Sequence, residues 1–204
     1  MTLTWYGHSC FLVETESARV VLDPYEPGSV PGLALPALTA DLVLCSHGHH
    51  DHCWADGVTL SGKPAGCTVT TVDTFHDEVQ GAKRGTNKIH ILDFDGVRVV
   101  HLGDLGHVLT PEQAAAVGRP DVLLIPVGGY YTIDPAEAKQ VTAQLQPKVI
   151  IPMHYRGAGF GYEEIGPVAE FTKLFDRVQT VPGSTVTWSP ELSGVILPET
   201  PKQN

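Results

Sequence analysis

One short segment constrains this chain more than any other, because it places four metal-binding side chains within six positions. Residues 46–53 read Ser-His-Gly-His-His-Asp-His-Cys, an H-x-H-x-D-H pattern made by His47, His49, Asp51 and His52. Burying so many ionisable groups costs several kcal/mol unless each is paired or ligated, and a divalent ion is the usual way to ligate imidazoles and a carboxylate together. The segment therefore predicts a metal site.

The residues before this motif place it at the end of a strand. Asp41-Leu-Val-Leu-Cys45 is a short apolar run with the length expected for a buried strand. Sites in α/β proteins collect at the carboxyl ends of strands, because a rigid strand fixes the backbone while the following loop aims the side chains. The alternative is a His-rich surface loop that binds metal only loosely.

Three further apolar runs end in a similar way. The runs at residues 67–72, 97–102 and 148–153 are followed by three ligand-type residues: His76, Asp104 and His154. A single histidine beside a strand is more often a hydrogen-bonded structural residue than a ligand. Four strand ends that each deliver a ligand-type residue indicate one shared site and argue against the surface loop.

The order H-x-H-x-D-H, lone His, Gly-Asp, lone His resembles the metallo-β-lactamase-fold hydrolases over residues 2–155. Shorter motifs resemble a branch of small, largely uncharacterised prokaryotic metal-dependent hydrolases, whose relatives include lactonases acting on a sugar-acid phosphate and phospholipases of the D type. These motifs are Trp5-Tyr-Gly-His-Ser-Cys-Phe11, Val21-Leu-Asp-Pro24, Gly103-Asp-Leu-Gly106, Pro126-Val-Gly-Gly129 and Pro152-Met-His-Tyr155. The resemblance implies a four-layer αββα sandwich, whereas periodicity alone indicates only an α/β fold.

The resemblance also implies a site for two divalent metal ions. The implied ligands of the first ion are His47, His49 and His76. Those of the second ion are Asp51, His52 and His154, and Asp104 is implied to bridge the two ions. Two such ions about 3.5–4 Å apart share a hydroxide, lower its pKa and polarise a carbonyl or phosphoryl oxygen of the substrate. Asp51 and Asp104 are the expected catalytic residues. Zinc is the expected metal, with manganese or iron as alternatives, because imidazole and carboxylate ligands suit all three.

Hydrolysis of an ester, lactone or phosphodiester bond is the expected activity. Diiron members of the fold that reduce oxygen carry Glu where this chain has His49, together with a flavin domain, so that redox role is disfavoured. Two alternatives stay open. Single-iron members that oxidise persulfides keep the H-x-H-x-D-H pattern, so a mononuclear iron dioxygenase fits the motif, and so does a non-catalytic metal-binding protein that has kept the ligands.

Five residues beside these motifs are further candidates. Asp23 resembles a carboxylate that orients a ligating histidine through its ring N–H, or it caps a turn. His8 either faces the metals or is structural. Tyr155 follows a ligand and could protonate a leaving group or hold an oxyanion, with a core role as the alternative. Lys83 and Arg84 lie in a glycine-containing loop and could hold an anionic group of the substrate.

Other residues are expected elsewhere or in lesser roles. His101 lies within a strand and is expected to be a packed or hydrogen-bonded core histidine. Tyr130 and Tyr131 follow a Gly-Gly turn near the expected cleft, with a core or rim role as the alternative. The histidines expected outside the site are His50, His90 and His107.

The charge of the chain bears on its partners. A net charge of −10 argues against nucleic acid, because phosphate binding depends on clusters of Lys and Arg. The charge of the expected metal site differs from that of the whole chain. Two divalent ions, two carboxylates and a hydroxide together carry roughly +1, which favours a small and anionic substrate.

Length and composition predict a single hydrolase domain over residues 1–204, with 42% hydrophobic residues to form its core. The start of the chain lacks a signal-peptide pattern and no stretch has the length of a membrane span, so we expect a cytoplasmic protein, with a homo-oligomer left open. The four cysteines show no C-x-x-C pairing and are expected to be reduced: Cys10, Cys45, Cys53 and Cys67.

Two helix starts and one long loop complete the sequence-based expectations. Thr110-Pro-Glu-Gln113 and Asp134-Pro-Ala-Glu137 each combine a capping residue, a proline in the first turn and Gln or Glu at the third position. The second helix should end near Pro147. The Pro- and Gly-rich loop at residues 24–36 is a candidate lid, and its Leu33 and Leu35 suggest contact with a partly apolar substrate or a subunit.

Overall fold

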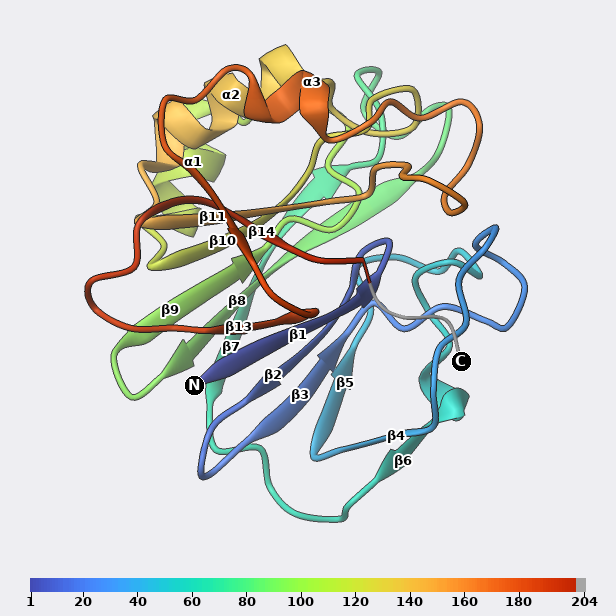
Figure 1. Ribbon diagram of the computed structural model, residues 1–204, viewed down its shortest axis with the longest axis vertical. Coiled ribbons are helices and arrows are strands. Elements are labelled where there is room, and N and C mark those ends of the chain that lie inside the picture. The colour runs from blue at the N-terminus through green and yellow to red at the C-terminus, as the bar shows by residue number, and fades with distance from the viewer. Residues whose placement is uncertain (201–204) are drawn as a thin grey trace.

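The computed structural model describes residues 1–200, which form two main β-sheets that face each other (Figure 1). In spatial order, the first sheet contains β13 (Thr185–Thr187), β1 (Thr2–Gly7), β2 (Cys10–Glu14), β3 (Arg19–Leu22) and β5 (Leu42–Leu44). The second contains β12 (Val178–Val181), β14 (Gly194–Pro198), β11 (Val149–Met153), β10 (Val122–Pro126), β9 (Val97–His101), β8 (Thr86–Phe94) and β7 (Thr68–Phe75). A small separate pair joins β4 (Leu38–Ala40) to β6 (Val58–Leu60).

The helices lie over the second sheet. They are α1 (Pro111–Val117), α2 (Pro135–Leu145) and α3 (Ala169–Thr172), which Figure 1 shows together on one side of the molecule. A short 3-10 helix, η1 (Ala55–Gly57), precedes β6. Packed sheets with helices agree with the α/β sandwich of the expected four-layer αββα fold, and α1, α2 and α3 form the helical layer over the second sheet. No helix within residues 1–200 is long and apolar enough to cross a membrane.

Both predicted helix starts are confirmed. Thr110 and Asp134 each accept a hydrogen bond from the backbone N–H three residues on, and the side chains of Gln113 and Glu137 bond back to the capping residues. These reciprocal bonds satisfy N–H groups that a helix start otherwise leaves without partners. The second helix, α2, ends at Leu145, close to Pro147 as expected.

The central strands of the second sheet are more deeply buried than the edge strand that precedes the H-x-H-x-D-H motif. All residues of β10 and β11 are buried, as expected for parallel strands that are covered on both faces. The strand at Leu42–Leu44, predicted to be buried, is only half-buried. The reason is its position: β5 is the last strand of the first sheet and pairs in that sheet with β3 alone.

The loop at residues 24–36 packs much of its apolar content inward. Tyr25 is buried and donates a hydrogen bond from its hydroxyl to the carbonyl oxygen of Tyr6, at 2.8 Å. Leu33 is only 8% exposed and lies so close to Gly7 that a Cβ there would approach its Cδ1 to 2.5 Å. The expectation that Leu33 contacts a substrate or subunit is therefore wrong, because this side chain packs against the first sheet. The role of the loop as a lid stays a prediction.

His101 links the two sheets through a buried hydrogen bond. Its Nδ1 accepts the backbone N–H of Gly103 at 3.1 Å, so in the neutral ring Nε2 carries the proton and donates to the carbonyl oxygen of Ser9, at 2.9 Å. Ser9 lies between β1 and β2 of the other sheet. Burial lowers the pKa of His101, which favours this neutral form. The prediction of a core histidine is confirmed.

We expect His101→Ala to lower the free energy of unfolding by about 1–3 kcal/mol, because a buried carbonyl and a buried N–H lose their partner. Urea denaturation followed by circular dichroism measures the change. His50→Ala is the matched control, since this histidine has a side chain that is 82% exposed and should change stability by less than about 0.5 kcal/mol. Equal stabilities of the two variants would contradict the inter-sheet role.

Candidate metal centre

Four strand ends of two different sheets deliver the predicted ligands to one place. The loop after β5 carries the H-x-H-x-D-H motif, and β7, β9 and β11 are followed by His76, Asp104 and His154. Asp104, His52, His76 and His154 are all buried. The structure therefore brings together side chains that are separated by more than half of the chain.

Asp104 lies at the middle of this cluster. Its Oδ2 is 3.1 Å from Nε2 of His52, 3.2 Å from Nε2 of His76 and 3.2 Å from Nε2 of His154. Nε2 of His47 is 3.9 Å away. Burial acts to raise the pKa of Asp104, but His154 and His52 beside it hold that pKa well below its usual range. Asp104 is thus an ionised carboxylate among imidazoles.

The donor atoms form three overlapping groups, and within each group every pair of atoms is at most 4.8 Å apart. The groups are His8, Asp51, His52 and His154; His47, His49 and His76; and His47, His52 and Asp104. The first two groups correspond to the two ligand sets implied by resemblance, with His8 added to one of them. The assignment of ions to these groups stays a prediction.

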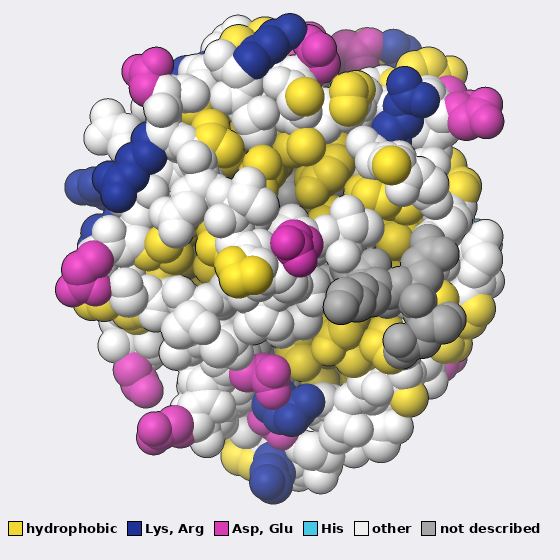
Figure 2. All heavy atoms as spheres, viewed as in Figure 1, with side chains coloured by type: hydrophobic (Ala, Val, Ile, Leu, Met, Phe, Trp, Pro, Cys, Tyr) yellow, Lys and Arg dark blue, Asp and Glu magenta, His cyan; other side chains and the backbone are white. Residues whose placement is uncertain are grey.

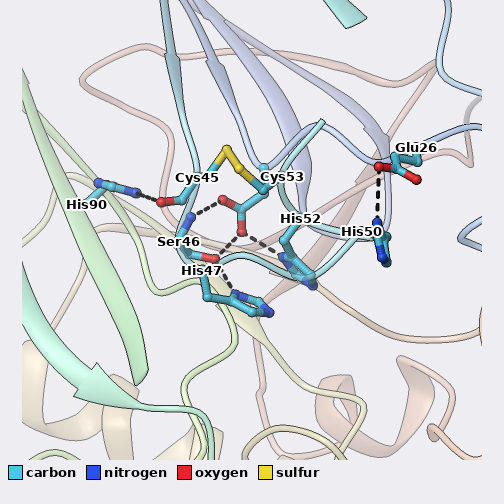
Figure 3. The surroundings of a disulfide bond; sticks show 9 residues. Glu26, Cys45, Ser46, His47, His50, His52, Cys53 and His90 are labelled. Carbon is cyan, nitrogen blue, oxygen red and sulfur yellow. Dashed lines mark hydrogen bonds and ion pairs between the residues drawn. A yellow bond between two sulfur atoms is a disulfide. The ribbon is translucent and has the colours of Figure 1, made fainter. Parts of the chain in front are cut away.

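Asp23 determines which nitrogen of two histidines carries a proton. Its Oδ2 accepts hydrogen bonds from Nδ1 of His52 at 2.8 Å and from the Ser46 hydroxyl at 2.6 Å. Because that hydroxyl proton is used, Ser46 Oγ accepts from Nδ1 of His47 at 2.9 Å (Figure 3). Burial and the neighbouring His52 lower the pKa of His47 to about 3, so its ring is neutral. Both histidines therefore turn Nε2 toward the centre, as a metal ligand requires.

The polar atoms of the cluster lack the partners that buried groups need. With its proton on Nδ1, His52 directs the lone pair of Nε2 at the Oδ2 of Asp104, so two acceptors face each other. Among residues 1–200, other buried atoms of the cluster without a hydrogen-bond partner are His8 Nδ1, His76 Nδ1, Asp104 Oδ1 and His154 Nδ1. A cation resolves this conflict, and imidazole with carboxylate donors fits zinc, manganese or iron.

A proton on His52 is the other way to separate the two acceptors. Burial acts to lower the pKa of His52, but Asp104 and Asp23 together hold it well above its usual range. In the absence of a metal ion the ring is therefore held as an imidazolium between two carboxylates. Metal binding at this position must displace that proton.

Three site residues adopt backbone conformations that side chains rarely accept. The φ angles are 50° at His8, 44° at Asp23 and 52° at His154. Residues held in this left-handed region cost on the order of 1–3 kcal/mol each and cluster at functional sites. The hydrogen bond from the backbone N–H of His154 to the carbonyl oxygen of His8, at 3.2 Å, ties two of them together.

Two further residues contact the outer carboxylate of the cluster. His8 Nε2 lies 3.3 Å from Oδ2 of Asp51, and burial with the nearby His154 lowers the pKa of His8 to about 4. The hydroxyl of Tyr162 lies 3.2 Å from the same Oδ2 and 2.8 Å from the carbonyl oxygen of Ser29. Sequence reasoning missed Tyr162, because a tyrosine in a glycine-rich stretch after His154 carries no distinctive signal.

A cavity of about 320 Å³ opens on the cluster. The side chains that line it are His49, Asp51, His76, Arg84, Asp104, Tyr131, His154 and Tyr162. Its size suits a small molecule rather than a polymer. Tyr162 also lines a neighbouring cavity of about 520 Å³ that includes Pro31 and Arg156.

Two of the candidates for substrate contact adopt their alternative roles. Tyr155 is 5% exposed and packs its ring against Trp5, with centroids 5.3 Å apart, so it belongs to the core. Lys83 is exposed and its ammonium group pairs with Glu78. Arg84, the next residue, lines the cavity instead. The two cations separate because consecutive side chains of a tight loop leave it in different directions.

A disulfide joins Cys45 to Cys53 and encloses the H-x-H-x-D-H motif (Figure 3). The expectation of four reduced cysteines is wrong for this pair and right for Cys10 and Cys67. The chain after β5 turns back on itself, with the N–H of Cys53 bonded to the carbonyl oxygen of His49 at 2.9 Å. This turn brings the two Cα atoms to 5.2 Å, a distance that sequence spacing could not predict.

Figure 3 also shows two histidines that lie outside the cluster, as expected. Nε2 of His90 is bonded to the carbonyl oxygen of Cys45 at 3.0 Å, next to the disulfide. His50 is exposed and pairs with Glu26. A third, His107, accepts the backbone N–H of Phe75 at 3.3 Å.

Comparisons with known proteins agree with the geometry. Residues 2–154 match the family model described as the beta-lactamase superfamily domain. Curated relatives include two proteins called UPF0173 metal-dependent hydrolase. One, from Archaeoglobus fulgidus, is 32% identical over 193 residues, which cover 76% of this chain and 83% of the relative. The other, from Methanoregula boonei, is 33% identical over 188 residues, covering 76% and 82%.

Solved structures give the same result. A Thermotoga maritima protein, described as a candidate Zn-dependent hydrolase of the metallo-beta-lactamase superfamily, has a TM-score of 0.77 and 38% identity, with 98% of both chains covered. A metallo hydrolase from Ignicoccus hospitalis has a TM-score of 0.65 at 22% identity, covering 85% of this chain and 89% of that one. The second likeness concerns the fold alone.

Replacing both Cys45 and Cys53 by Ser should lower the free energy of unfolding by about 2–3 kcal/mol, as expected for opening a loop of this length. Chemical denaturation with and without dithiothreitol measures the effect, which reductant should reproduce in the unaltered protein. Cys67→Ser, at a free cysteine, should not change the response to reductant. Titration of four thiols in denatured, unreduced protein would contradict the disulfide.

We expect Asp23→Asn to weaken metal binding about 10- to 100-fold, because the ring proton of His52 loses its ionised acceptor. Asparagine tolerates the positive φ at this position, so the backbone should be preserved. Ser46→Ala should weaken binding less, through His47 alone. Competition with a chromogenic chelator measures the affinity, with His101→Ala as the control. An unchanged affinity in both variants would refute the orienting role of Asp23.

Proposed function

Because this chain belongs to the metallo-β-lactamase superfamily and is a metal-dependent hydrolase, we propose that it cleaves an ester, lactone or phosphodiester bond of a small molecule. One observation carries this proposal: the ionised Asp104 has imidazoles from three different elements within 3.2 Å of one oxygen, at the base of a cavity of about 320 Å³. Neither a serine nor a cysteine nucleophile is required.

We assign the metal ligands to two ions. His47, His49 and His76 would hold one ion, Asp51, His52 and His154 would hold the second, and Asp104 would be shared between them. Zinc, manganese or iron would supply two kinds of chemistry there: a lower pKa for a bound water molecule and polarisation of the oxygen of the scissile group. Two separate donor groups, linked by a third group that contains Asp104, favour two ions over one.

Other residues of the chain then orient the proposed ligands through hydrogen bonds. Asp51 and Asp104 are the proposed catalytic carboxylates. His8, neutral near pH 7 because its pKa is about 4, donates from Nε2 to Oδ2 of Asp51 and holds that oxygen in place. The Tyr162 hydroxyl, on the wall of the cavity, lies 3.2 Å from the same oxygen and helps to hold it in place. Asp23 keeps two ligand rings oriented through their Nδ1 protons.

Two alternatives are separated from hydrolysis by metal content. A mononuclear iron dioxygenase would bind one iron per chain and show no hydrolysis. A non-catalytic metal-binding protein would bind metal without any turnover. Elemental analysis of untagged, anaerobically purified protein, with assays on a phosphodiester and a lactone panel, distinguishes them; two zinc or manganese ions per chain support the dinuclear hydrolase.

The remaining proposals concern partners and location. We treat residues 1–204 as one hydrolase domain that acts without a nucleic-acid partner. On the face drawn in Figure 2, Lys and Arg side chains lie apart from one another among Asp and Glu, rather than in a basic patch. The cytoplasm stays the predicted location, and the Cys45–Cys53 disulfide counts against it because disulfides are rare in reducing compartments.

Asp104→Ala should remove the second metal ion and lower kcat/KM more than about 100-fold. This loss exceeds the roughly 10- to 100-fold that is typical when a residue that only hydrogen-bonds to a metal ligand is removed. Metals are counted per chain and activity is measured on the same sample. His101→Ala, also buried but outside the cluster, should keep both ions and most of the activity. Retained hydrolysis in the Asp104 variant would overturn the bridging assignment.

A further inference from the structure

The cavity beside the metal centre contains one permanently cationic side chain. Its lining consists of five proposed metal ligands, two tyrosines and Arg84. Carboxylates and imidazoles that bind metal ions are not free to recognise the rest of a substrate. Arg84 is therefore the charged group of this lining that remains for recognition.

Hydrogen bonds hold Arg84 in position. The carboxylate of Asp77 accepts four backbone N–H groups of the loop that follows His76, including that of Arg84 at 2.8 Å. Nη2 of Arg84 donates to the carbonyl oxygen of Tyr130 at 3.0 Å, and the guanidinium lies over the ring of Tyr131 with its Cζ 5.6 Å from the centroid. The side chain is thus half-buried and preorganised.

The guanidinium of Arg84 has N–H donors that no carboxylate of the described residues uses. Among residues 1–200, no carboxylate oxygen lies within 4.0 Å of it, and one of its five N–H groups is used by Tyr130. Five other Lys and Arg residues have acidic partners within 4.0 Å, namely Arg19, Lys83, Lys88, Arg98 and Lys173. Arg84 is distinguished by lining the cavity beside the metal centre. A half-buried guanidinium without a carboxylate, facing a cavity, is suited to an anionic group of a ligand.

Two tyrosines connect this cation to the metal centre. The rings of Tyr131 and Tyr162 meet edge to face with centroids 5.8 Å apart, and the Tyr162 hydroxyl lies 3.2 Å from Asp51. Arg84, Tyr131, Tyr162 and Asp51 thus form a continuous wall of the cavity. A substrate that lies along this wall contacts the metal centre at one end and Arg84 at the other.

We propose that Arg84 binds a carboxylate or phosphate group of the substrate that is separate from the bond being cleaved. The substrate is then a small anionic ester or lactone, of a size that fits about 320 Å³. This inference rests on the proposed hydrolase function for its chemistry, but the anion-binding role of Arg84 can be measured without turnover.

The test measures binding of two probes to the metal-loaded protein by calorimetry: 4-hydroxybenzoate and 4-hydroxyphenyl phosphate. Arg84→Gln should weaken binding of one or both about 10- to 100-fold, the expected effect of losing charge-assisted hydrogen bonds. Arg84→Lys should restore part of the affinity as a point charge. Lys83→Gln is the matched control, since Lys83 is the cation next to Arg84 in sequence but is exposed and pairs with Glu78.

Each outcome decides the proposal. Loss with one probe alone supports it and identifies the anion, and loss with both supports it for either anion. Unchanged affinity in Arg84→Gln, or equal losses in Arg84→Gln and Lys83→Gln, overturns it. Assays on 4-acetoxybenzoate and its methyl ester test hydrolysis separately: anion binding that depends on Arg84 without ester cleavage would reject the proposed function and leave this inference standing.

Discussion

The burial of one charged carboxylate organises this protein. Asp104 is almost completely removed from solvent, and an isolated buried charge would cost more than a domain can tolerate. Imidazoles at the ends of strands from both sheets surround it, and a metal ion or a proton must complete the balance. The cluster therefore exists only where the two sheets are packed together, because its side chains come from the strand ends of both.

Asp23 extends this constraint outward. One carboxylate fixes the Nδ1 proton of His52 directly and that of His47 through the Ser46 hydroxyl, which turns both Nε2 atoms toward the cluster as the proposed ligand atoms. The positive φ angles at His8, Asp23 and His154 show that the backbone accepts strain to hold these positions. The Cys45–Cys53 disulfide limits the motion of the loop between them at the level of the backbone. Hydrogen bonds, strain and a covalent link thus all restrict the same few ligands.

The part of the cavity wall that carries Arg84 is held in a different way. Here Asp77 folds a loop around its carboxylate, and the loop presents Arg84 beside Tyr131. In the proposed enzyme, the metal ligands carry the reactivity, and Arg84, at the other end of the same wall from Asp51, recognises the substrate. An enzyme built in this way can keep its chemistry while changes at residues 81–87 alter the substrate.

The sequence by itself determined the set of ligand-type residues at strand ends, the α/β fold class and the two capped helices, because ligand types, apolar runs and capping residues act over short distances. It also identified His101 as a core residue and Asp23 as a candidate partner of a ligand. Tertiary structure alone decided the rest. Tyr162 reaches Asp51 from a distant loop, Tyr155 turns into the core, and Arg84 rather than Lys83 faces the cavity. Cys45 and Cys53 meet because of the turn between them. These outcomes depend on the direction of a side chain and on the path of a loop, which are set by packing between segments far apart in the chain.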